Sequence, residues 1–164
     1  MTFKQLEALR KIRCIADYQF GRGVGDVLFP EEVVIIHSKR TGRIRYVYLH
    51  GELLATLRPL DGLFSLTVEG ARRILEGGLA KGMLVVVMDE AAPFVRMGRN
   101  VFAKHVVDAA ERILPQEEVI VVDGNGEVLA VGRAALTGRE MKAFKRGVAV
   151  QVRRGAGKAY ERRG

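Results

Sequence analysis

Hydrophobic positions recur at helical spacing in the first twenty residues of the chain. Residues 4–20 place apolar side chains on one side of a helix and most charged side chains on the other, which predicts an amphipathic helix. The apolar side consists of Leu6, Leu9, Ile12, Ala16 and Phe20. The segment FGRGVGD follows, and its three glycines predict a turn that ends the helix. Because it lacks the Lys-Ser/Thr pair, preceding strand and following helix of a phosphate-binding loop, we interpret it as a plain turn.

A strand pattern then replaces the helical one. Three short runs are separated by breaks of hairpin length, which predicts an antiparallel meander. The runs comprise residues 33–37, 43–49 and 52–57. A further helix is predicted to begin after Thr67, a good N-cap, and to end at Gly77-Gly78. Residues 1–78 therefore predict a small α+β domain.

The middle run of this meander has two different faces. Ile44, Tyr46 and Tyr48 alternate onto one face, and Arg43, Arg45 and Val47 alternate onto the other. We expect the face with the two tyrosines to pack on the first helix. The alternative is that it forms an apolar surface for a protein partner.

Short strands dominate the second half of the chain. The pattern predicts several strands with two short helices between them, and Gly124-Asn125-Gly126 is a strong hairpin signal. The predicted strands are 84–88, 101–107, 119–123, 128–136 and 148–152, and the helices are 90–97 and 138–146. This arrangement is typical of a small β-barrel. Residues 79–155 form the expected second domain, and residues 156–164 form a basic tail.

Composition limits the class of protein. No apolar run approaches the roughly 18 residues of a membrane span, and the first residues lack the core of a signal peptide. The single cysteine, Cys14, excludes a disulfide framework within the chain. We therefore expect a soluble, cytoplasmic protein that does not associate with membranes.

The sequence offers no arrangement of residues that would carry catalysis. The three histidines, His37, His50 and His105, are far apart and lack the spacing of zinc ligands. The pairs Glu31-Glu32 and Glu117-Glu118 each precede a predicted strand, so we interpret them as solvated loop carboxylates. We expect no catalytic residue, no metal site and no cofactor, and hence a protein that is not an enzyme.

The distribution of positive charge indicates the class of binding partner, which the search for catalytic residues does not. The net charge is +8, and residues 79–164 contribute +5 of it with 15 cations and 10 anions. Arg96, Arg99 and Lys104 cluster around Gly98 and Phe102, where a phosphate could approach the backbone and an exposed ring could stack on a base. Such a cluster favours an RNA partner. The alternative is a solvated charged face followed by a disordered tail, and we expect Phe102 to be a core residue rather than a stacking one.

Residues 81–155 resemble a PUA domain. The resemblance rests on Gly98 followed by VFAKHV, the hairpin leading into VLAVGRA, the helix after Thr137, and GVAVQVRRG. The segments ADYQFGRGVGDVLFP and LATLRPLDGLFSLTVEGARRIL resemble the region that precedes the PUA domain in archaeal tRNA-guanine transglycosylase, and archaeosine synthase carries a similar pair of domains. The fold implied is a small α+β domain followed by a PUA β pseudo-barrel, which is of the α+β class. The catalytic barrel and the cysteine-rich zinc site of the transglycosylase have no counterpart in the sequence.

The resemblance also implies a site and a partner. In the family the PUA domain binds the acceptor stem and 3′ end of tRNA, with segments that correspond to residues 96–104 and 147–154. The implied RNA-binding residues are Arg96, Gly98, Arg99, Phe102, Lys104, Arg153 and Arg154. We expect a non-catalytic RNA-binding protein that binds tRNA as an accessory to tRNA modification, with a separate catalytic subunit as a possible partner. The alternative is a ribosome-assembly or translation factor that binds rRNA through the PUA domain.

Overall fold

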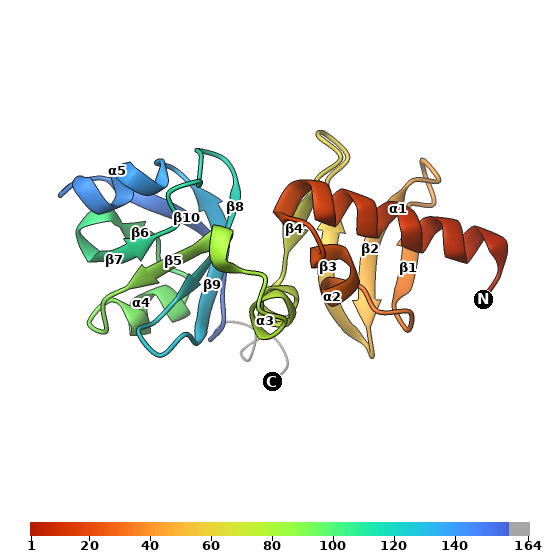
Figure 1. Cartoon of the computed structure of the whole chain (residues 1–164), viewed down its shortest axis with the longest axis horizontal. Coiled ribbons are helices and arrows are strands. Elements are labelled where there is room, and N and C mark those ends of the chain that lie inside the picture. Colours follow the sequence, from red (N-terminus) through yellow and green to blue (C-terminus); the bar gives the residue numbers. More distant parts are fainter. Residues whose placement is uncertain (158–164) are drawn as a thin grey trace. The chain divides into compact units, whose positions relative to one another are not determined.

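The computed structural model describes residues 1–157, and the chain divides into two units, Met1–Leu79 and Ala80–Gly164 (Figure 1). We call them the N-terminal and C-terminal units. Each combines helices with a β-sheet, so the predicted α+β class is confirmed. Residues 158–164, which make up most of the expected basic tail, lie outside the described residues.

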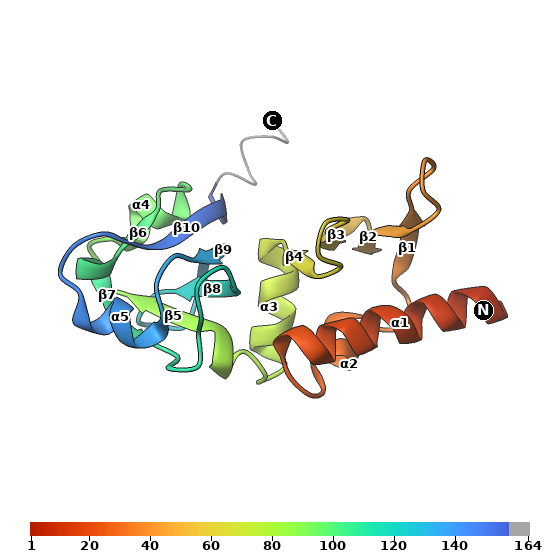
Figure 2. The same ribbon diagram turned by 90° about the horizontal axis from the view of Figure 1, so that it is seen from above.

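The N-terminal unit packs helices on a four-stranded antiparallel sheet with the strand order β1-β2-β3-β4. Figure 2 shows α1 and α2 on the same side of this sheet. The elements are α1 (Phe3–Phe20), α2 (Val24–Leu28), β1 (Val34–His37), β2 (Ile44–Leu49), β3 (Glu52–Leu57), β4 (Phe64–Leu66) and α3 (Val68–Glu76).

Helix α1 forms where the apolar spacing predicts it. Thr2 caps its start in a capping box with Gln5, and Gly21 with φ +124° ends it. Leu9, Ile12, Ala16 and Phe20 are buried as expected. Leu6, which we also expected on the buried side, is 42% exposed because the first turns of α1 extend beyond the core.

The glycine segment after α1 differs from the plain turn that we predicted. Gly21 and Gly23 adopt positive φ as a turn requires, but the chain then forms α2. Gly25 lies so close to α1 that a Cβ there would be 2.3 Å from the carbonyl oxygen of Arg13. The glycine therefore allows the two helices to meet closely, which places Val24 and Leu28 in the core.

A change of register explains why the faces of β2 differ from the prediction. In the pairing of β2 with β1, Tyr46 lies opposite Ile36 and Ile44 lies opposite His37. Arg45 between them has no opposite residue, so it is an extra residue in the ladder. Because the alternation shifts there, Ile44 and Val47 are both buried. Tyr46 pairs with exposed Ile36 and Tyr48 with exposed Val34, so the tyrosines lie on the face opposite the buried Val47. The expected packing of Tyr46 and Tyr48 on the first helix is wrong.

The C-terminal unit is a six-stranded mixed sheet with the order β6-β10-β9-β8-β5-β7, in which only β5 and β8 pair in parallel among the described strands. Its core lies between these strands and the helices α4 and α5. The elements are η1 (Lys81–Met83), β5 (Leu84–Val87), α4 (Ala92–Arg96), β6 (Val101–Phe102), η2 (Ala103–His105), β7 (Val106–Ala109), β8 (Glu118–Val122), β9 (Val128–Ala134), α5 (Gly138–Ala143) and β10 (Val148–Gly155).

The single strand predicted over residues 101–107 is divided in the structure. β6 pairs with β10 at one edge of the sheet, and β7 pairs with β5 at the other edge. The short helix η2 connects them, so the chain turns from one edge to the other and nearly closes the sheet into a barrel. The predicted hairpin between β8 and β9 and the Thr137 cap of α5 are confirmed.

Candidate functional site

The two segments expected to bind RNA, residues 96–104 and 147–154, lie side by side in the C-terminal unit. Phe102 of β6 pairs with Val148 of β10, and the backbone N–H of Val152 donates to Oδ1 of Asn100 at 3.0 Å. Farther along, the N–H of Gly157 donates to the carbonyl oxygen of Arg96 at 2.9 Å. These contacts bring together segments that are about 46 to 61 positions apart in sequence.

Gly98 has a backbone conformation that favours glycine. Its φ is +100°, and it ends α4 with its N–H donating to the carbonyl oxygen of Val95 at 2.9 Å. The chain is tightly packed there, because a Cβ on Gly155 would lie 2.6 Å from the nitrogen of Gly98. Gly98 therefore has a structural role that is independent of any ligand.

The cations on this surface are of two kinds. Arg99 and Lys104 are exposed and form no ion pair with any residue between 1 and 157. Arg96 is partly exposed and pairs with Glu127, with 3.3 Å between Nη2 and Oε2. Free cations can bind a phosphate without first breaking an ion pair, so Arg99 and Lys104 are the stronger candidates.

Arg153 is held by a carboxylate. Its Nη1 and Nη2 donate to Oε1 and Oε2 of Glu118 at 2.7 and 2.8 Å, and the Glu118 side chain is only 1% exposed. Glu118 is therefore buried and paired, so its interpretation as a solvated loop carboxylate is wrong. The ion pair neutralises a buried charge, which gives Arg153 a structural role.

Phe102 is 44% exposed, so the expectation that it belongs to the core is wrong. Its ring meets His105 edge-on, with 6.3 Å between the ring centroids and an interplanar angle of 82°. β6 lies at the edge of the sheet, which explains why the ring is exposed. An exposed ring beside Lys104 can stack on an unpaired base.

Three residues of this neighbourhood were not singled out from the sequence as site residues. Phe144 is 44% exposed at the end of α5, and Lys145 and Arg146 follow it on the surface. The N–H of Ala103 donates to the carbonyl oxygen of Gly147 at 2.9 Å, so this segment borders η2. The available signal in the sequence was an aromatic residue followed directly by two cations.

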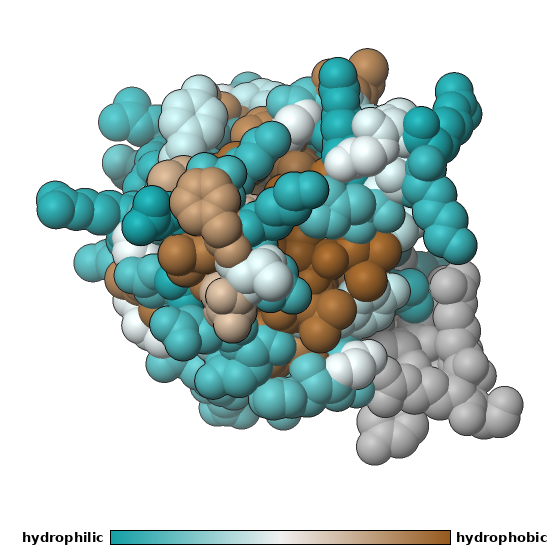
Figure 3. Space-filling view, turned by 90° about the vertical axis from the view of Figure 1, so that its right-hand side faces the viewer, coloured by the Kyte–Doolittle hydropathy of each residue, from teal (hydrophilic) through white to brown (hydrophobic). Residues whose placement is uncertain are grey.

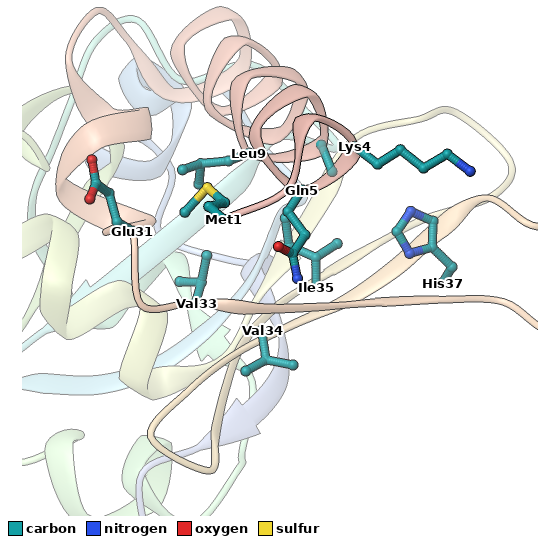
Figure 4. A pocket seen from close by; sticks show the side chains of 10 residues that line it. Met1, Lys4, Gln5, Leu9, Glu31, Val33, Val34, Ile35 and His37 are labelled. Carbon is teal, nitrogen blue, oxygen red and sulfur yellow. The ribbon is translucent and has the colours of Figure 1, made fainter.

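An exposed apolar groove lies in the N-terminal unit between α1 and the edge strand β1. Figure 3 shows apolar side chains gathered on the face of the molecule that carries these elements, and Figure 4 shows Leu9, Val33 and Ile35 around the groove. Its volume is about 420 Å³, and Val34 at its rim is 54% exposed. An apolar surface beside an unpaired strand edge is typical of a contact with another protein.

The described residues hold no group of three or more histidine, cysteine or acidic side chains that could bind a metal ion. Within residues 1–157, no helix is long and apolar enough to cross a membrane.

The two units match two different family models. Residues 10–78 match the patch-forming domain C2 of tRNA-guanine transglycosylase, and residues 83–156 match the PUA domain. The resemblance inferred from the sequence is confirmed, and each match falls within one structural unit.

Curated relatives match almost the whole chain. The tRNA-guanine(15) transglycosylase of Thermococcus kodakarensis is 45% identical over 152 residues, which cover 93% of this chain and 26% of that protein. The protein of the same name from Methanothermobacter thermautotrophicus is 41% identical over 150 residues, which cover 92% of this chain and 23% of that protein. The chain thus spans about a quarter of the length of these relatives.

Two solved structures share the fold. A hypothetical protein from Pyrococcus horikoshii superposes with a TM-score of 0.75 at 23% identity, and the match covers 100% of this chain and 98% of that protein's chain. A conserved PUA domain protein from Thermoplasma acidophilum superposes with a TM-score of 0.66 at 20% identity, and the match covers 97% of this chain and 95% of that protein's chain. At this level of identity the two structures support the fold alone.

Proposed function

We propose that this chain, which consists of a C2 domain of the tRNA-guanine transglycosylase type followed by a PUA domain, binds tRNA and does not itself catalyse base exchange. The PUA domain is an RNA-binding fold, and the curated relatives are named for their action on tRNA. The observation that carries the proposal is that Arg99, Phe102 and Lys104, which follow one another within six residues beside β10, are all exposed. Two unpaired cations and a half-exposed ring are the groups that bind phosphates and stack on bases.

We call the segments 96–104 and 147–154 the PUA surface, and within this proposal their residues have different roles in RNA binding. Arg99, Lys104 and Arg154 contact phosphates, and Phe102 stacks on a base near the 3′ end of the acceptor stem. Arg96 and Arg153 are already paired with carboxylates, so we assign them a smaller contribution. Gly98 maintains the turn that presents Arg99.

A catalytic partner is the second part of the proposal. Among residues 1–157 the three histidines are far apart in sequence, and no group of three or more histidine, cysteine or acidic side chains could hold a metal ion, so we assign catalysis to a second chain. A binding domain that holds the acceptor end would raise the effective concentration of tRNA at a catalytic chain. The apolar groove between α1 and β1 supports such a protein contact. Both chains would then work in the cytoplasm.

The test combines binding with catalysis. The purified chain is titrated into fluorescent tRNA, into the same tRNA shortened by its unpaired 3′ nucleotides, and into an rRNA fragment of similar length. We expect the intact tRNA to bind most tightly and the chain alone to incorporate no labelled guanine into tRNA. Equal binding of all three RNAs would contradict acceptor-end recognition, and incorporation of guanine by the chain alone would contradict the non-catalytic role.

A further inference from the structure

A second concentration of positive charge lies in the N-terminal unit, away from the apolar groove. A hollow of about 750 Å³ opens between α1, the β1–β2 turn and the β3–β4 turn, which lie at the same end of the sheet (Figure 1). We call it the basic hollow. Its charged lining residues are Lys11, Arg40, Arg43, Arg45 and Arg58. These are five of the twelve cations of residues 1–78, and no carboxylate from the described part of the chain lines the hollow.

The β1–β2 turn holds two of these arginines at the rim. The backbone N–H of Ser38 donates to the carbonyl oxygen of Arg43 at 2.7 Å, and the N–H of Gly42 donates to the carbonyl oxygen of Ser38 at 2.8 Å. Arg40 and Arg43 are exposed, and neither they nor Lys11 forms an ion pair with any residue in the described part of the chain. Their charges are therefore available to a ligand.

Two other arginines are fixed by the protein. Arg45 is the extra residue of the β2 ladder, and its Nη1 donates to the carbonyl oxygen of Leu57 at 3.3 Å while its guanidinium lies 5.7 Å from the ring centroid of Tyr46. Arg58 is held by Asp61, with 2.9 Å between Nη2 and Oδ2, and by the hydroxyl of Ser65. A fixed guanidinium loses less conformational entropy when it binds an anion.

The composition of the hollow indicates the chemistry of its ligand. Five cations around one opening repel one another, and Asp61 offsets only part of that charge, so an anion would relieve the repulsion. Ile15, Ile44 and Leu57 supply apolar surface between the cations. Cations that alternate with apolar surface suit a phosphodiester chain, whose phosphates are separated by sugars.

We propose that the basic hollow binds phosphates of the same RNA that the PUA domain holds, so that both domains contact RNA. This inference rests on the proposed function, and it gives the N-terminal domain an RNA contact in addition to the protein contact proposed for its apolar groove. Arginine binds phosphate with two parallel hydrogen bonds, so the four arginines among the five cations suit this ligand.

The test uses the full chain and a pair of charge-matched variants. R40A/R43A removes two unpaired cations of the hollow, and R10A/R22A removes two exposed cations of the same unit that do not line it. Fluorescence anisotropy with intact tRNA is measured over a range of salt concentrations. We expect R40A/R43A to bind about 10- to 30-fold more weakly and the plot of log affinity against log salt to become shallower by about 2. R10A/R22A should stay within about two-fold of wild type.

The outcomes separate this inference from the proposed function. If wild type does not bind tRNA, both fail. If R99A/K104A weakens binding while R40A/R43A behaves like R10A/R22A, the PUA surface binds RNA and the basic hollow does not. A loss of affinity with identical circular dichroism, and with an effect additive to that of R99A/K104A, supports the basic hollow as a second contact.

Discussion

Arg153 of β10 clamps Glu118 of β8 with two parallel hydrogen bonds, 2.7 and 2.8 Å long, although the two residues belong to strands that are not neighbours in the sheet. β9 lies between them, so the ion pair ties three consecutive strands of the barrel together. The Glu118 side chain is almost completely buried, so this guanidinium compensates a carboxylate that has little contact with water.

The first prediction concerns this ion pair. Arg153→Ala leaves a buried carboxylate without its main partner, which costs about 3–5 kcal/mol in fully buried pairs. Because the Arg153 side chain is 35% exposed, water can replace part of the interaction, and we expect a loss of about 2 kcal/mol. Urea unfolding followed by circular dichroism measures it. The double variant with leucine at both positions should recover most of the stability, whereas an unchanged midpoint in Arg153→Ala would show that the pair is not stabilising.

The second prediction concerns Gly98. With φ at +100°, Gly98→Ala forces a side chain into a strained conformation, so we expect a loss of about 1–2 kcal/mol in the free energy of unfolding. Gly124→Ala is the control, because its φ is not positive and a Cβ there meets only Oδ1 of Asp89 at 3.7 Å. Equal stability of the two variants would contradict the strain.

The third prediction tests the unpaired cations of the PUA surface. Arg99→Ala and Lys104→Ala should each weaken tRNA binding by about 1 kcal/mol, because each removes one charge-assisted phosphate contact. Their exposure means that the fold should remain intact. Lys81→Ala, which removes an exposed cation of the same unit, is the matched control. Wild-type affinity in both variants would place the RNA elsewhere on the chain.

The fourth prediction concerns the exposed ring. Phe102→Ala should weaken binding to single-stranded 3′ ends by about 1–3 kcal/mol if the ring stacks on a base. Phe102→Tyr keeps an aromatic face and should bind like wild type. If Phe102→Leu, which keeps apolar bulk, also binds like wild type, the contact is hydrophobic rather than a stacking interaction.

The sequence predicted the features that depend on neighbouring residues. The Thr137 cap, the hairpin at Gly124-Asn125-Gly126 and most of the buried side of α1 follow from local spacing, and all agree with the structure. The resemblance to the PUA domain supplied the order of the elements and the site segments, and the family match confirmed the resemblance.

Features that depend on distant residues could not be predicted. The strand over residues 101–107 breaks because its two halves pair with strands at opposite edges of the sheet. The extra residue Arg45 shifts the faces of β2, and no local signal marks it. Glu118 appeared to be a solvated carboxylate because its partner, Arg153, lies 35 residues away in sequence.

The most direct test of RNA binding is the salt dependence of the affinity for intact tRNA. If the PUA surface neutralises about four phosphates, the slope of log affinity against log salt should be about −3 to −4, and contacts in the basic hollow should make it steeper by about 2. Filter binding between 50 and 200 mM salt, roughly the range over which such contacts are lost, gives the slope. A slope of −3 or steeper is the predicted result, and a slope near zero would contradict phosphate binding by this chain.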